Sequence, residues 1–267
     1  MGTTTGMATN PIPLSTVNSK ALPKMQRRDT WWIQPLATFV VFVAFIIYVT
    51  FRTFENANFE VGSYLSPLYS PHLPIHLMFF GKNVSPAIFI LPVPLLFRGT
   101  CYYYRKAYYR AFVLDPAACA VSEAPYRKGY NGEKGILIIQ NFHRYAFYLA
   151  AIVMVVLWWD TILAFTSHDA AGTHFTLRVG SLVFLANVIL LSMYTFSCHS
   201  FRHLSGGCMN CFSCSEGAKT RHTLWEKISH LNENHALWAW CSLFSVALTD
   251  LYVRSLAIGM PIDFKFF

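Results

Sequence analysis

Five apolar segments, each about as long as a lipid bilayer is thick, most strongly limit the folds that this chain can adopt. A helix needs ~20 mainly apolar residues to cross a hydrocarbon core of ~30 Å, and in lipid every backbone polar group must be paired within the protein. The sequence therefore predicts an all-α integral membrane protein whose five transmembrane helices form an up-and-down bundle. The expected spans cover approximately residues 33–51, 84–104, 145–165, 177–197 and 236–258.

Composition supports a membrane protein and excludes an ordinary soluble domain. Of the 267 residues, 54% are hydrophobic and 13% are charged, whereas soluble domains average about 25% charged residues. The net charge of +8 does not predict nucleic-acid binding, because the basic residues lie next to the apolar segments. The N-terminal residues lack the apolar core of a signal peptide. We expect a polar cytoplasmic segment (1–30), a five-helix membrane-anchor domain (31–260) and an outer tail (261–267).

The basic residues also predict how the bundle is oriented. They gather in the N-terminal segment, in the loop between the second and third spans, and in the loop between the fourth and fifth. The loop over residues 166–176 contains neither Lys nor Arg. Because cytoplasmic loops carry the excess of positive charge, we expect a multi-pass protein of the inner (plasma) membrane with its N-terminus in the cytoplasm.

Two carboxylates within the spans, Asp160 and Asp250, lie toward the outer ends, where Arg178 and Arg254 are at similar depth. Charged side chains inside a membrane usually pair with one another. We therefore expect ion pairs between helices there, although the pattern alone also fits a proton path.

Histidines and cysteines gather at the opposite, cytoplasmic ends of the spans. None of the ten histidines lies at mid-membrane depth, so no haem is expected in this chain. Mixed thiolate and imidazole donors suit zinc or an iron–sulfur cluster, and a Rieske-type [2Fe–2S] cluster takes two of each. Interfacial hydrogen bonding and simple packing are the alternatives that the pattern leaves open. The clustered residues are Cys101, His143, Cys198, His199, His203 and His235.

Three cysteines in the loop between the fourth and fifth spans form a separate pattern. Cys208, Cys211 and Cys214 follow a C-x₂-C-x₂-C spacing that matches part of a ferredoxin ligand set, but the fourth cysteine is absent. They could form a second metal site with His203 or His222. A plain loop rich in small residues fits the same pattern.

Aromatic and basic side chains collect next to the clustered histidines and cysteines. Such residues form a belt at the membrane interface, and they could also surround a quinone head group, whose carbonyl oxygens need hydrogen-bond donors. The residues predicted to line a quinone site are Tyr102, Arg105, Arg144, Ser200 and Trp238.

Several strings resemble the single membrane-anchor subunit of a succinate dehydrogenase, and most closely that of the actinobacterial-type complex II, whose haemless anchor holds a Rieske-type cluster. The resemblance covers roughly residues 30–255, and its strings lie at Phe97–Arg110, Pro116–Val121, Gln140–Tyr145, Ser197–His203 and Thr249–Val253. It implies a flavoprotein partner that oxidises succinate and an iron–sulfur partner that passes electrons to this anchor, which reduces a quinone. A higher oligomer of the complex is compatible with the resemblance.

Two features depart from that family pattern. Phe201 stands where relatives often have a second cysteine, so this position supplies no ligand. The Cys208–Cys214 run has no counterpart from which a role could be transferred.

The resemblance does not fix the ligands, so we choose them by geometry. Cys101 and Cys198 end the two spans that run toward the cytoplasm, and His143 and His235 begin the two that leave it. One residue from each of these four helix ends gives a Cys₂His₂ set, with the histidines on one iron and the cysteines on the other. His199, His203 and Cys119 are the reserves.

Three other classes of protein compete with this interpretation. A haem-bearing cytochrome b anchor needs paired histidines inside the membrane, and the spans offer none. A histidine-rich membrane desaturase or hydroxylase needs several His boxes, whereas only His199 and His203 have that spacing. A scaffold or transporter subunit with interfacial histidines remains open.

Overall fold

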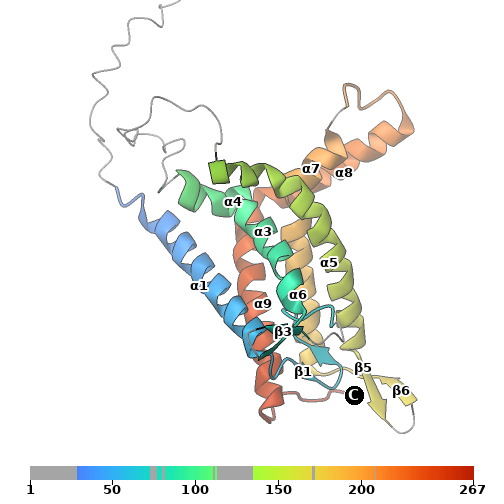
Figure 1. The fold of residues 1–267 in the computed structure, drawn as a ribbon. Helices are drawn as coiled ribbons and strands as arrows, with labels where there is room; N and C mark the ends of the chain where they lie inside the picture. Colours follow the sequence, from blue (N-terminus) through green and yellow to red (C-terminus); the bar gives the residue numbers. More distant parts are fainter. Residues whose placement is uncertain are drawn as a thin grey trace, which may run out of the picture.

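A computed structural model describes residues 29–72, 77–79, 82–110, 112, 135–169, 172–207 and 209–267. Long helices stand side by side in a bundle, with short helices at one end and β-hairpins at the other (Figure 1). In the described part, four helices are long and apolar enough to cross a membrane, or five if one bent pair is a single span. The four are α1 (Ile33–Glu55), α5 (His143–Leu163), α6 (Val179–Phe196) and α9 (His235–Ala257). The prediction of a helical membrane bundle is confirmed at that level.

The outward surface of the bundle is apolar, as lipid contact requires. On α5, Ile152, Val155 and Trp159 are largely exposed, whereas Ala146 and Ala150 are buried against the neighbouring helices. Small residues on the inner face allow helix backbones to approach closely. Close packing of this kind holds helices together in a bilayer, where the hydrophobic effect does not drive them to associate. The protein therefore places its large apolar side chains toward the membrane.

The second predicted span is broken in the structure. It consists of α2 (Ala87–Ile90), α3 (Pro92–Thr100) and α4 (Tyr102–Arg105), followed by a π-helical turn (Lys106–Arg110). The bend of 62° lies between Ala87–Thr100 and Tyr102–Tyr108. The break falls at Cys101, whose backbone is extended with φ −59° and ψ 133°. That break turns Cys101 into the interior.

Short antiparallel hairpins close one end of the bundle, and we refer to it as the hairpin end (Figure 1). The sequence pattern did not indicate them, because each strand has only two to four residues. The pairs are β1 (Glu60–Val61) with β2 (Tyr64–Leu65), β3 (Leu77–Phe79) with β4 (Lys82–Val84), and β5 (Thr166–Asp169) with β6 (Gly172–Phe175).

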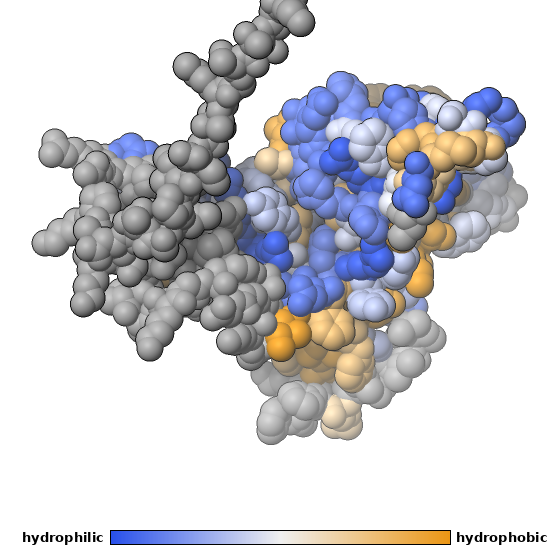
Figure 2. Space-filling view, turned by 90° about the horizontal axis from the view of Figure 1, so that it is seen from above, coloured by the Kyte–Doolittle hydropathy of each residue, from blue (hydrophilic) through white to orange (hydrophobic). Residues whose placement is uncertain are grey.

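The opposite end, which we call the site end, carries a helical arm made of α7 (His199–Gly206) and α8 (Glu216–Glu233). Seen from above, this end is mainly hydrophilic, with apolar side chains toward its edges (Figure 2). The guanidinium of Arg202 lies 4.8 Å from the centre of the Trp225 ring, and Arg221 donates to the carbonyls of Ser205 and Gly207 at 2.9 and 3.1 Å. These contacts hold α8 against α7 outside the apolar bundle.

A buried ion-pair network lies at the hairpin end. The carboxylate of Asp250 accepts a hydrogen bond from Arg254 Nε at 2.8 Å and further bonds from the hydroxyls of Ser66 and Tyr48. Arg254 also lies 2.9 Å from Glu55 on α1. Asp250 therefore pairs with Arg254 within α9. The ion pair that links α9 to α1 is the one between Arg254 and Glu55.

The second predicted intramembrane pair has different partners. Asp160 accepts a hydrogen bond from the hydroxyl of Ser70, while Arg178 lies 3.7 Å from Asp263 in the C-terminal tail. Asp160 therefore ties α5 to the segment before α2, and the expectation that it pairs with Arg178 is wrong. The chain segment around Ser70, which lies between the first two spans, occupies the position beside the Asp160 carboxylate.

Candidate metal centre

Four helix ends meet at the site end and bring together the predicted Cys₂His₂ set. Cys101 Sγ lies 3.2 Å from His235 Nε2, and Cys198 Sγ lies 2.9 Å from His143 Nε2. Both thiols are almost completely buried, at 2% and 1% exposure. The structure therefore places two thiol–imidazole pairs side by side in a protected position.

The two cysteines occupy equivalent places in the chain. Each stands at a break between two helices, α3 and α4 for Cys101 and α6 and α7 for Cys198. Both have an extended backbone, and Cys198 Sγ accepts the backbone N–H of Ser200 at 3.4 Å, which caps the short α7. An extended residue between helices directs its side chain away from either helical register, and here both thiols point inward.

A hydroxyl residue precedes each cysteine and contacts the imidazole that the other cysteine faces. Thr100 Oγ1 lies 2.9 Å from His143 Nδ1, and Ser197 Oγ lies 2.6 Å from His235 Nδ1. Each imidazole is thus held by a hydroxyl from one segment and a thiol from the other. Sequence reasoning missed this arrangement, although the repeated hydroxyl–cysteine pair, Thr100–Cys101 and Ser197–Cys198, was its visible signal.

The hydroxyl contacts also select the tautomer of each histidine. Thr100 donates its hydroxyl proton to the Leu96 carbonyl at 2.7 Å, and Ser197 donates to the Tyr194 carbonyl at 3.0 Å. A hydroxyl has one proton to donate, so its oxygen accepts from Nδ1–H of the histidine. The lone pair of each Nε2 then faces a thiol, which is the orientation that a metal ligand needs.

Aromatic rings enclose the two imidazoles. Phe97 stacks on His143 with ring centres 4.9 Å apart, and Tyr194 stacks on His235 at 5.1 Å. The buried hydroxyl of Tyr194 interacts with the thiol of Cys101. It therefore lies beside one of the candidate ligands.

Burial keeps the thiol of Cys198 neutral. This residue lies between α6 and α7, and loss of solvent contact raises the pKa of its thiol to about 12. A metal would have to displace the proton, because the thiolate is the metal-binding form.

The candidate donors lie in pairs rather than in a larger group. Within the described residues, no three His, Cys, Asp or Glu side chains converge as a group that could hold a metal ion. The four candidate donors instead form two mixed pairs, each made of one thiol and one imidazole.

The reserve ligands lie outside this set or outside the described residues. His199 packs edge-on to Tyr102, with ring centres 6.4 Å apart, and His203 Nδ1 contacts the guanidinium of Arg144. Cys119 and Cys208 lie outside the described residues. Cys211 and Cys214 form a disulfide, and a metal site there would need their reduced thiolates.

The predicted quinone residues surround the same end but lie in separate contacts. The guanidinium of Arg105 lies 5.3 Å from the Tyr102 ring centre, whereas Arg144 contacts His203. Ser200 donates its backbone N–H to Cys198 Sγ, which caps α7, and Trp238 donates to the Leu231 carbonyl at 3.2 Å. Of the predicted quinone residues, Tyr102 and Arg105 are the two whose side chains contact each other.

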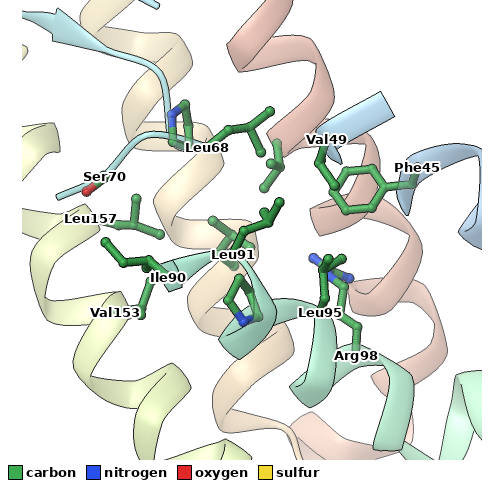
Figure 3. A pocket seen from close by; sticks show the side chains of 14 residues that line it. Phe45, Val49, Leu68, Ser70, Ile90, Leu91, Leu95, Arg98, Val153 and Leu157 are labelled. Atoms are coloured by element: carbon green, nitrogen blue, oxygen red, sulfur yellow. The ribbon is translucent and has the colours of Figure 1, made fainter. Parts of the chain in front are cut away.

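A partly open, mainly apolar cavity lies deeper in the bundle. Its volume is about 70 Å³, and Figure 3 shows Arg98 and Ser70 among the apolar side chains around it. Sites for drug-sized ligands usually measure roughly 300–1,000 Å³. The cavity is therefore too small for a quinone head group as it stands.

Comparisons with known proteins agree with this architecture. Residues 33–259 match the family described as actinobacterial succinate dehydrogenase subunit SdhC. The chain is also similar to one in a solved structure, the Mycobacterium smegmatis Sdh1 complex in the apo form, with 40% identity and a TM-score of 0.79. That similarity covers 92% of this chain and 96% of the other. No protein with a curated functional description matches.

Proposed function

Because this chain belongs to the actinobacterial succinate dehydrogenase subunit SdhC family, we propose that its buried Cys₂His₂ set holds a Rieske-type [2Fe–2S] cluster between the partner subunits and a quinone. The chain is a multi-pass plasma-membrane subunit of a succinate dehydrogenase complex. Catalysis on succinate takes place in other subunits of that complex.

The observation that carries the proposal is the crossed arrangement of the two thiol–imidazole pairs. Thr100 and Ser197 hold the histidine tautomers that present Nε2 to the site. Phe97 and Tyr194 cover the imidazole faces. When bound, such a cluster supplies one-electron transfer at a potential that its neutral imidazole ligands raise.

A spectrum of the purified complex tests the proposal. Reduction with succinate should give a Rieske-like EPR signal, together with iron and acid-labile sulfide beyond the content of the partner subunits. The control is the same complex with Cys101→Ser and Cys198→Ser, which should lack that signal. A b-type α-band assigned to this subunit, or zinc in place of the extra iron, would contradict the proposal.

We also propose that the quinone head group binds at the site end, near Tyr102 and Arg105. Guanidinium groups can donate to quinone carbonyls, and the tyrosine ring offers a packing surface. Replacing Arg105 and Arg144 by glutamine should lower quinone reduction about tenfold, which corresponds to losing one hydrogen bond to a developing negative charge. Succinate oxidation by a soluble dye should be unchanged.

Lys219→Gln is a matched control, because Lys219 is an exposed cation on α8 at the same end. An assembled Arg105/Arg144 variant that reduces quinone at the parental rate would place the quinone elsewhere.

For the topology, we propose five spans with the site end in the cytoplasm. The bent pair around Cys101 then counts as the second span, and the excess of Lys and Arg in the loops of the site end supports the orientation. A membrane-impermeant thiol reagent should not reach a cysteine introduced within residues 120–135 in intact cells. Labelling of that cysteine from outside the cell would show that the orientation is opposite to the one proposed.

A further inference from the structure

Arg98 is a buried arginine one helical turn before the candidate ligand Cys101. Only 4% of its surface is exposed. Its guanidinium donates to the Tyr104 hydroxyl at 3.1 Å, the Ala239 carbonyl at 3.2 Å and the Ser242 hydroxyl at 2.9 Å. Arg98 therefore joins α3 to α4 and α9 directly beside the candidate metal centre.

Every partner of this guanidinium is electrically neutral. Among the described residues, no carboxylate forms an ion pair with Arg98, and on another side it borders the apolar cavity (Figure 3). Arg254, which is also buried, pairs instead with Asp250 and Glu55. A buried charge without a counter-charge is costly, so Arg98 is a cation in need of an anion.

The candidate centre lies next to this cation. The guanidinium carbon is 4.5 Å from the centre of the Tyr194 ring, and Tyr194 in turn stacks on His235. The backbone N–H of Cys101 donates to the Arg98 carbonyl at 3.1 Å. The Tyr194 ring thus contacts both the guanidinium of Arg98 and the imidazole of His235.

We propose that Arg98 is the counter-charge that stabilises the reduced state of the centre, an inference that rests on the proposed function. In a bound cluster, two thiolates would balance the charge of an oxidised [2Fe–2S] core, and two neutral imidazoles would add none. Reduction by one electron would then give the centre one net negative charge. A fixed guanidinium in a medium of low dielectric constant favours that charge.

The reduction potential of the cluster tests this proposal independently of activity. In the purified complex, EPR-monitored redox titration of Arg98→Gln should show an equilibrium constant for reduction that is lower by about tenfold or more. This corresponds to a midpoint potential about 59 mV lower for one electron. Arg98→Lys keeps the charge and should stay close to the parental midpoint. Arg178→Gln, which removes a cation at the hairpin end, is the control and should not shift the midpoint.

The outcomes separate this inference from the proposed function. No Rieske-like signal in the parental complex would remove the proposed function itself. A parental signal with an unshifted midpoint in Arg98→Gln would overturn only the role of Arg98. If Arg98→Gln loses the cluster, retention of the cluster in Arg98→Lys supports the role of charge, whereas its loss in both variants contradicts it.

Discussion

Replacing His143 and His235 together by alanine is expected to abolish quinone reduction, while succinate oxidation by soluble dye acceptors continues. Both imidazoles present Nε2 to a buried thiol and are fixed at Nδ1 by a hydroxyl. Removing both leaves two of the four proposed donors, so one side of the cluster loses its protein ligands. Electrons from succinate would then stop at the partner subunits, where a soluble dye can still collect them.

The matched variant is His199→Ala with His203→Ala. These histidines lie at the same end of the bundle but outside the crossed pairs, so the EPR signal should persist in that variant. Measurement of both activities and of the EPR spectrum on assembled complexes decides the matter. An intact signal and full quinone reduction in the His143/His235 variant would transfer the ligand role to His199 and His203.

Replacing Asp250 by alanine should destabilise the complex by about 3–5 kcal/mol, the usual cost of breaking a buried ion pair from one side. Asp250 is completely buried and accepts hydrogen bonds from Arg254, Ser66 and Tyr48. Its loss would leave the Arg254 cation with Glu55 alone. Denaturant unfolding of the purified complex, followed by helix content, measures the effect.

A double variant shows whether the uncompensated charge causes that loss. Asp250→Ala with Arg254→Met removes both charges, and it should be less destabilised than Asp250→Ala alone. Glu216→Ala is the control for losing an exposed ion pair, because Glu216 contacts Lys219 on the surface of α8, and such pairs contribute little. Equal losses in the single and double variants would contradict the explanation.

The long helices could be predicted from hydropathy, because contact with lipid requires apolar residues along their whole length. The expected spans over residues 145–165, 177–197 and 236–258 differ from α5, α6 and α9 by only one or two residues at each end. The hairpins and α8 were not predicted. Strands of two to four residues carry too little pattern, and α8 is a polar helix that forms on its Ser215 cap and its packing against α7.

The meeting of the four candidate ligands could also be predicted, because alternating helices in a bundle bring their ends together. What the sequence could not show was the break at Cys101 or the contacts that cross between segments. These depend on the backbone angles of Cys101 and Cys198 and on which hydroxyl reaches which imidazole. The role of Arg98 could not be predicted for a related reason, because its lack of a counter-charge is visible only when its neighbours in the structure are known.

The position of the four donors at one end of the bundle has an energetic consequence for the proposed pathway. Moving one elementary charge through the whole membrane field involves about 2.3 kcal/mol per 100 mV. The four helix ends lie beside α7 and α8, far from the hairpins (Figure 1). An electron that enters and leaves at that end traverses little of the field. The electron transfer step through such a site would therefore depend little on the membrane potential.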